Sequence, residues 1–352
     1  MLLFKDTNII SVITSNPSLS SKGIWEVLNV KHADSKMSYA TLKRRLNNLS
    51  AQNLISSVGK GRGTTYIISP GFRVLYPVDV EEYFTNDMAQ RNAKTGFDFD
   101  LIANVLQDAN LFTEEELNIL NELQEEYTEN SSSLSKNENK KAIEHLSIDL
   151  SWKSSEIEGN TYTLLETEAL LKNNETAKGK TMEEANMLLN HKQAIDFLIL
   201  EKNYLEPLSV TKIENIHSLL VKNLNVDRNI RKGIVTVTGT NYKPLDNEHQ
   251  IREALLGMCK LVNNRENVFE KALLALVLIS YIQAFGDGNK RTARIISNGI
   301  LIQNSFCPIS FLTINTVDYK EAMLIFYEQN NISAFKKIFI DQFEHAAITY
   351  FS

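Results

Sequence analysis

Apolar positions recur along the chain with two different periods. Near the N-terminus, three stretches follow helical spacing and two later ones alternate as strands do. The expected helices cover residues 9–13, 21–28 and 38–52, and the expected strands cover 54–58 and 64–68. Beyond residue 97 helical spacing dominates, and strand-like alternation returns at 231–244. The pattern predicts a small α+β domain at residues 1–75, a connector at 76–96, and a mainly α-helical body with one β-hairpin at 97–352.

Short local signals set some of the helix boundaries. Thr113 with Glu116, and Thr163 with Glu166, have the spacing of capping boxes, in which two side chains each accept a backbone N–H. The first pair predicts a helix that ends shortly before the serine-rich run 129–133. That polar run predicts a surface loop.

A loop between two apolar helices contains the most concentrated polar chemistry. Residues 272–282 are almost wholly apolar, and the segment after Arg294 is apolar again at helical spacing. Between them, Gly286 and Gly288 permit a tight turn and a close approach of the backbone to a ligand. A helix that begins near Asn289 would offer unpaired N–H groups and a positive dipole end. The segment therefore predicts an anion site.

The charged residues of this loop suit phosphates in particular. Arg291 and Arg294 lie three positions apart, so they emerge from the same face of the helix and can both reach an anion held there. Asp287 is the one acid in the loop. Its carboxylate could bind a magnesium ion that bridges the phosphates.

Residues 283–294, with the sequence QAFGDGNKRTAR, resemble the signature His-x-Phe-x-Asp/Glu-Gly-Asn-Gly/Lys-Arg-x-x-Arg of Fic (Fido) domains at every fixed position except the first. The resemblance implies a mostly helical domain that uses ATP and Mg²⁺, commonly to transfer AMP to a Ser, Thr or Tyr hydroxyl of a target protein. It implies that Phe285 anchors the loop and that Asp287 binds the metal. By the same resemblance, the nucleotide site comprises Gly286, Gly288, Asn289, Lys290, Arg291 and Arg294, and the catalytic positions are Gln283, Asp287, Asn289 and Arg291.

Gln283 stands where the family places its catalytic histidine. A carboxamide can hydrogen-bond a hydroxyl but cannot accept its proton near neutral pH. Losing a general base typically removes about 10² to 10⁴ in rate. Three explanations stay open: a natural pseudoenzyme, a site whose proton passes to water or another residue, or a laboratory substitution. Two of the six histidines, His217 and His249, flank the predicted hairpin, and neither is expected to serve as a substitute base.

Residues 151–159 resemble the end of the inhibitory helix found in many Fic proteins, with the motif Ser/Thr-x-x-x-Glu-Gly/Asn. Ser154, Glu158 and Gly159 occupy its fixed positions. The resemblance implies that Glu158 pairs with Arg294 and blocks the place of the γ-phosphate. The alternative is a solvated helix acid that precedes a glycine C-cap.

The alternating segment 231–244 falls where the family places its flap. By the resemblance, the backbone of Thr236, Val237 and Thr238 would pair with an extended stretch of the target protein by adding a strand. The alternative is a hairpin that only connects helices.

Charge separates the N-terminal region from the rest of the chain. Residues 1–75 contain ten Lys or Arg against three acids, a net charge of +7, so the remainder carries −13 of the total of −6. A basic module on an acidic body indicates a polyanion partner for the module. Its order of elements resembles a winged helix, which implies DNA contacts by Tyr39, Lys43 and Arg44 on helix 38–52 and by Lys60 and Arg62 on the wing. The alternative is a protein-contact or dimerisation module.

Composition indicates a two-domain protein with a sizeable core. Of the 352 residues, 43% are hydrophobic, and the longest apolar run is too short to span a membrane. Cys259 and Cys307 lack the spacing of a zinc site or redox motif, so we expect the protein to reside in the reducing cytoplasm.

Three classes of function fit these observations. The favoured one is a Fic-type protein adenylyltransferase, inhibited by Glu158 and weakened by Gln283. The second is another reaction of the same fold, either AMP removal with Glu158 orienting a water, or phosphate transfer, because the phosphorylating Doc branch carries lysine at the position of Lys290. The third is a DNA-binding transcriptional regulator that senses ATP without turnover. A homodimer is compatible with each.

Overall fold

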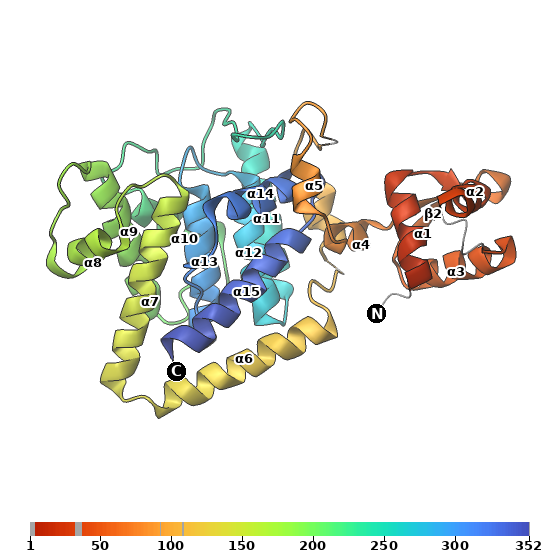
Figure 1. Ribbon diagram of the computed structural model, residues 1–352. Coiled ribbons are helices and arrows are strands. Elements are labelled where there is room, and N and C mark those ends of the chain that lie inside the picture. The colour runs from red at the N-terminus through yellow and green to blue at the C-terminus, as the bar shows by residue number, and fades with distance from the viewer. Residues whose placement is uncertain (1–3, 32–36, 92, 108, 352) are drawn as a thin grey trace. The chain divides into compact units, whose positions relative to one another are not determined.

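A computed structural model describes residues 4–31, 37–91, 93–107 and 109–351 (Figure 1). The chain divides into two compact units, Met1–Tyr76 and Pro77–Ser352. Helices dominate, and the strands form one small three-stranded sheet. The mainly helical fold class expected from the sequence is confirmed.

The first unit packs three helices against this sheet. Its elements are α1 (Phe4–Ser15), β1 (Leu19–Ser20), α2 (Ser21–Lys31), α3 (Tyr39–Ala51), β2 (Ile55–Val58), the 3₁₀ turn Gly61–Gly63, β3 (Thr65–Ile68) and α4 (Pro70–Leu75). The strands are antiparallel in the order β1-β3-β2, with Ile55 opposite Ile68. The Ser38 side chain caps α3 by accepting the Thr41 N–H. The two-residue strand β1 was not predicted, because two residues cannot show a period.

The second unit is a helical body around two central helices. Its elements are α5 (Val80–Phe84), the π-helical turn Leu101–Val105, α6 (Glu114–Ser133), α7 (Lys136–Ile157), α8 (Leu164–Asn173), α9 (Met182–Leu200), α10 (Val210–Leu220), α11 (Glu248–Asn264), α12 (Val268–Ile282), α13 (Asn289–Gln303), α14 (Thr316–Gln329) and α15 (Ser333–Tyr350). Every residue of α12 from Ala272 to Ile282 is buried. Helices α12 and α13 pack along each other in the middle of the unit (Figure 1). The loop that joins them is therefore anchored in the core.

The capping boxes expected at Thr113 and Thr163 are present, each with both reciprocal hydrogen bonds. The surface loop expected at 129–133 is wrong, because α6 continues through this run. The hydroxyls of Ser131, Ser132 and Ser133 donate to backbone carbonyls three residues earlier. Serine is compatible with the end of a helix when its hydroxyl is satisfied locally.

The hairpin expected at 231–244 is also wrong, because the described backbone forms no strand there. The segment is held at its ends instead: the Arg231 N–H donates to the Ala284 carbonyl over 3.0 Å, and the Lys243 N–H donates to the Thr95 carbonyl over 3.0 Å. Gly96 and Lys243 form one isolated parallel bridge. A two-stranded hairpin without a further strand is marginal, and these end contacts replace its internal pairing.

The expected connector 76–96 proves to be part of the second unit beyond Tyr76. Glu328, a fully buried residue of α14, organises this docking. Its carboxylate accepts a hydrogen bond from the Tyr83 hydroxyl at 2.5 Å and lies 3.4 Å from the Arg91 guanidinium. Its backbone carbonyl accepts the Lys94 N–H at 2.8 Å. Sequence periodicity missed this segment because long-range polar contacts, rather than an apolar stripe, hold it in place.

Candidate nucleotide site

The loop between α12 and α13 is built by two residues in the left-handed backbone region. Gln283 ends α12 with φ of 52°, and Gly288 caps α13 with φ of 81°. Between them, Phe285 is fully buried and stacks on the His217 ring, with centroids 3.7 Å apart. The loop thus enters the core at Phe285 and leaves Gly286 and Asp287 exposed. This is the anchoring role expected of Phe285.

Asn289 holds the shape of the loop. Its side-chain amide donates to the Phe285 carbonyl at 2.8 Å, and its side-chain oxygen accepts the Phe285 N–H at 2.9 Å. The same amide group donates to the Gln283 side-chain oxygen at 3.1 Å. Asn289 is therefore a structural link between the start of the loop and the first turn of α13.

His217 supports the loop from α10. Its ring nitrogens lie 2.9 Å from the Asp287 carbonyl and 3.3 Å from the Arg228 carbonyl. Burial lowers the pKa of this histidine. A buried, stacked ring with both nitrogens against carbonyls is a structural residue, as the sequence indicated, while His249 lies exposed in the first turn of α11.

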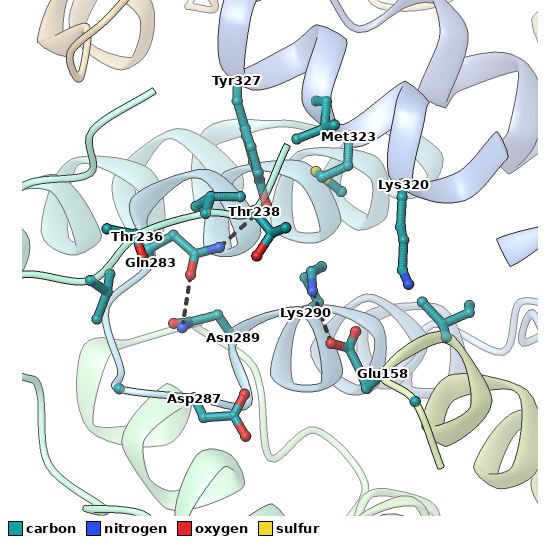
Figure 2. Close-up of a pocket in the computed structure, with 16 residues that line it drawn as sticks. Glu158, Thr236, Thr238, Gln283, Asp287, Asn289, Lys290, Lys320, Met323 and Tyr327 are labelled. Carbon is teal, nitrogen blue, oxygen red and sulfur yellow. Dashed lines mark hydrogen bonds and ion pairs between the residues drawn. The ribbon is translucent and has the colours of Figure 1, made fainter. Parts of the chain in front are cut away.

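Gln283 lies at the cavity with its carboxamide already engaged (Figure 2). The amide group donates to the Ser280 carbonyl at 2.7 Å and contacts the Tyr327 hydroxyl at 3.3 Å. The side-chain oxygen accepts from Asn289. The Gln283 carboxamide thus stands at the position of the proton acceptor. It is held in place by hydrogen bonds, and it is not a base.

Glu158, the C-cap of α7, meets two cations of α13. One carboxylate oxygen lies 3.0 Å from the Arg294 guanidinium and the other lies 2.8 Å from the Lys290 ammonium. Arg294 also donates to the Ser154 hydroxyl at 2.7 Å and to the Ser154 carbonyl at 2.9 Å. The contact between Glu158 and Arg294 is the pair that the resemblance implied, whereas the contacts of Arg294 with Ser154 and of Glu158 with Lys290 were not predicted.

Electrostatics keep this carboxylate ionised. Burial by itself would raise the pKa of Glu158, but the positive charges of Arg294 and Lys290 outweigh burial and lower the pKa to about 2. Gly159 follows with φ of 95°, which ends the helix directly after the acid.

Arg291 pairs with an acid of the loop and does not line the cavity, where the resemblance implied a phosphate ligand. Its side chain is buried and lies 2.8 Å from the Asp287 carboxylate, which is 61% exposed. Neither Arg291 nor Arg294 lines the cavity. Three of their buried nitrogens, Nε and Nη1 of Arg291 and Nη1 of Arg294, have no hydrogen-bond partner within the described parts of the chain. These nitrogens are buried and do not line the cavity, so they contribute positive charge near the loop and make no direct contact with the cavity.

A cavity of about 490 Å³ opens over the loop (Figure 2). The loop contributes Gln283, Gly286, Asp287, Asn289 and Lys290, the end of α7 contributes Ile157, Glu158 and Gly159, and residues 235–238 form one edge. Helix α14 contributes Lys320, Met323, Leu324 and Tyr327, none of which was predicted from the sequence. The helical spacing of these residues predicts a side of the helix that faces the core. Nothing in the local sequence distinguishes a side that faces the core from one that faces a cavity.

Asp287 suits a magnesium ion held mainly by phosphates. Its carboxylate accepts the Gly288 N–H at 2.6 Å and pairs with Arg291. The described His, Cys, Asp and Glu residues form no group of three or more that could hold a metal. A single carboxylate is still sufficient for Mg²⁺ when phosphate oxygens and waters complete the shell.

Comparison with known proteins identifies the domain that contains this loop. Residues 207–301 match the sequence model of the Fic/DOC family. The Fic/DOC domain is thus assigned to residues 207–301. Protein adenylyltransferase fic-1 of Caenorhabditis elegans is 28% identical over 160 residues, which cover 44% of this chain and 31% of that protein. Protein adenylyltransferase Fic of Nematostella vectensis is 27% identical over 188 residues, 52% of this chain and 44% of that protein. The chain thus matches less than half the length of these relatives.

Solved structures agree on the fold around the Fic/DOC domain. Residues 134–508 of Fic-1 from C. elegans align with a TM-score of 0.59 at 20% identity, covering 67% of this chain and 72% of that structure. A Fic domain containing signaling protein from Bacteroides thetaiotaomicron aligns with a TM-score of 0.56 at 18% identity, covering 65% and 94%. These similarities show a shared fold.

Arg231, to which the sequence pattern assigned no role, joins the segment 231–244 to the loop between α12 and α13. Its guanidinium donates to the Gln283 carbonyl at 2.6 Å, to the Gly233 carbonyl at 2.5 Å and to the Leu245 carbonyl. The side chain is 8% exposed. A buried arginine whose donors meet three carbonyls fixes both ends of the segment relative to the loop.

The predicted DNA contacts lie outside the Fic/DOC domain, in the first unit. Tyr39, Lys43 and Arg44 are exposed on α3, and the Lys43 ammonium lies 5.0 Å from the centre of the Tyr39 ring. Lys60 is exposed directly before the turn Gly61–Gly63. The side chain of Arg62 lies outside what the structure describes.

Cys259 and Cys307 are buried free thiols, and burial raises the pKa of Cys259 to about 12. Within the described ranges, no helix combines the length and the apolar character needed to cross a bilayer.

Proposed function

We propose that this protein transfers AMP from ATP to a hydroxyl side chain of a target protein. The observation that carries the proposal is the Fic/DOC loop, whose residues Gly286, Asn289 and Lys290 line a cavity of about 490 Å³. The matched relatives are named protein adenylyltransferases. In this reaction the hydroxyl oxygen bonds to the α-phosphorus, the bond from that phosphorus to the bridging oxygen breaks, pyrophosphate leaves, and the hydroxyl proton passes to an acceptor.

The residues around the cavity have separate parts in this proposal. The backbone N–H groups at the start of α13 and the Lys290 ammonium bind the phosphates, and the buried Arg291 adds positive charge near the loop. Asp287 would hold Mg²⁺, which neutralises phosphate charge when bound. Gln283 can orient the hydroxyl by a hydrogen bond, but it cannot take the proton, so turnover is impaired as the sequence stands.

Glu158 inhibits the site in this proposal. Its carboxylate occupies Arg294 and Lys290, the cations that would otherwise face the terminal phosphate. Negative charge at that place repels a γ-phosphate and neutralises its ligands. ATP would then bind without the geometry needed for transfer.

Residues 236–238 are proposed to bind the target. They form an edge of the cavity, and within the described chain no hydrogen bond uses the backbone of Thr236, Val237 or Thr238. Free backbone donors and acceptors can pair with an extended peptide by adding a strand. Such pairing would supply the second strand that the segment lacks by itself.

Mass spectrometry of the purified protein incubated with ATP, magnesium and cell lysate tests the proposal. An AMP adduct on this chain or on a lysate protein supports transfer. A phosphate adduct identifies the phosphotransferase alternative, and intact ATP bound without any adduct identifies a nucleotide sensor. The mass of the adduct separates the first two outcomes.

A second function belongs to the first unit, for which we infer DNA binding. The supporting observations are its net charge of +7 and the exposed side chains of Tyr39, Lys43 and Arg44 on one helix. Such a face suits phosphate contacts and entry into a major groove. A module that binds a protein partner instead would show no salt-dependent affinity for DNA.

A further inference from the structure

Lys290 contacts the one carboxylate oxygen of Glu158 that Arg294 leaves free. The Lys290 ammonium lies 2.8 Å from Oε2, and Arg294 Nη2 lies 3.0 Å from Oε1. Both oxygens of the carboxylate are therefore paired with different cations. To withdraw Glu158 from this site, two ion pairs must break.

The two cations differ in how firmly they are held. The Arg294 side chain is fully buried, donates twice to Ser154 and lies against the Tyr319 ring at 5.2 Å. The Lys290 side chain is 26% exposed and lines the cavity (Figure 2). Its only side-chain partner in the described parts of the chain is Glu158. Lysine is a compact charge on a flexible stem, so Lys290 can change partner without disturbing the core.

We propose that Lys290 is an exchangeable lock on Glu158: it holds the acid in place in the free protein and moves to the terminal phosphate of a bound nucleoside triphosphate. This inference rests on the proposed function and specifies its regulation. A terminal phosphate carries more charge than one carboxylate and can compete for the ammonium within the cavity. Once Lys290 changes partner, Glu158 is held by Arg294 alone and is easier to displace.

This movement of Lys290 from Glu158 to the terminal phosphate, here called the hand-over, is tested by calorimetry with a non-hydrolysable ATP analogue and magnesium. The Lys290→Gln substitution is compared in two backgrounds. In the Glu158→Gln background the substitution removes a phosphate ligand, and we expect at least threefold weaker binding. With Glu158 present, the same substitution also unlocks the acid, so we expect the loss to be smaller by at least threefold, or to become a gain. Equal fold-changes in the two backgrounds would overturn the hand-over.

Two controls isolate the contact from general charge effects. Lys320→Gln removes another cavity lysine that forms no described ion pair with Glu158, and it should change affinity equally in both backgrounds. AMP lacks the terminal phosphates, so Lys290→Gln should leave its affinity within twofold. A loss of AMP affinity as large as that of the ATP analogue would assign Lys290 to the α-phosphate and overturn the proposal.

A nucleotide-free measurement separates this inference from the proposed function. Thermal unfolding of the full chain should show that Lys290→Gln lowers the transition temperature by about 2 °C more with Glu158 present than in the Glu158→Gln background. Equal shifts would show that the lock does not exist. If no variant binds the ATP analogue, the AMP-transfer proposal and the hand-over fail, and the unfolding result still decides whether Lys290 holds Glu158.

Discussion

The carboxylate of Glu158 stabilises the fold of the second unit through the same contacts that would inhibit the site. Its pKa falls from an ordinary value of 4.5 to about 2, since the charges of Arg294 and Lys290 outweigh the opposing effect of burial. A carboxyl group with a lowered pKa stabilises the folded state fully above its unfolded pKa and loses that contribution as pH falls. The contact should therefore be complete throughout the physiological range.

Glu158→Gln should lower the free energy of unfolding by about 2 kcal/mol near pH 7, because it leaves two cations without their partner. The difference should stay constant above about pH 4.5 and shrink as the pH falls toward about 2. Denaturant unfolding at several pH values measures it. Glu168→Gln, which removes an exposed helix pair, serves as the control because exposed pairs contribute little. A difference independent of pH down to pH 3 would contradict an ionic origin.

Gln283→His adds the missing base, and we expect it to raise AMP incorporation by at least about tenfold in a Glu158→Gly background. The inhibitory acid is removed so that only the general base differs. Intact-mass spectrometry over time gives the rate. Gln283→Asn keeps a carboxamide and should give no gain. Equal rates for the His and Asn variants would show that proton transfer does not limit the reaction.

At the scale of an element, the loop between α12 and α13 depends on one glycine more than on the other. Gly288 has φ of 81°, and a Cβ there would lie 3.3 Å from His217 Nε2 and 3.4 Å from Val221 Cγ1. Gly286 has neither a left-handed φ nor an atom within 4 Å of such a Cβ. The turn geometry therefore rests on Gly288, whereas the exposed Gly286 leaves the backbone open to the cavity.

Gly288→Ala should lower the free energy of unfolding by about 1 to 2 kcal/mol, because a side chain is strained in the left-handed region and crowds His217. Gly286→Ala should change it by less than about 0.5 kcal/mol. Chemical denaturation of both variants checks the contrast. Equal destabilisation would mean that the loop does not have the backbone geometry described.

Another element, the segment after Pro77, contacts the segment 231–244 through polar side chains. Arg91 lies 3.4 Å from the buried Glu328 and donates to the Gly239 carbonyl at 2.6 Å. The Asn241 side chain donates to the Met88 carbonyl at 3.1 Å. The C-terminal part of segment 231–244 is thus held by residues about 150 positions earlier in the chain.

For the whole molecule, the main physical contrast is a basic unit joined to an acidic body. The first unit carries +7 and the remainder carries −13. If the first unit binds DNA, its affinity should fall with salt according to the number of phosphates that it neutralises.

Replacing Lys43 and Arg44 together with Gln should reduce the slope of log affinity against log salt by about 2, because each cation releases roughly one counterion. Fluorescence anisotropy with a duplex at several salt concentrations measures the slope. Lys172→Gln, an exposed lysine of the second unit, should leave it unchanged. Loss of affinity without a change in slope would assign the two residues to stability rather than to phosphate contact.

Features that depend on a few neighbouring residues could be predicted from the order of residues. Helical period predicted the helix at 38–52, where α3 buries Leu42, Leu46 and Leu49. The capping boxes at Thr113 and Thr163 followed from side chains three positions apart. The signature loop likewise lies within twelve consecutive residues. Local sterics and hydrogen bonding act over this range, so they can be inferred from the order of residues alone.

Which distant groups come into contact depends on how the helices pack. Lys290 reaches Glu158 across 132 positions, α14 supplies a wall of the cavity, and the ends of segment 231–244 are held by residues far away in the chain. An unpaired lysine and a paired one look alike in a sequence. Their energies differ only after packing removes water and fixes the distance between the charges, and that depends on the whole arrangement of helices.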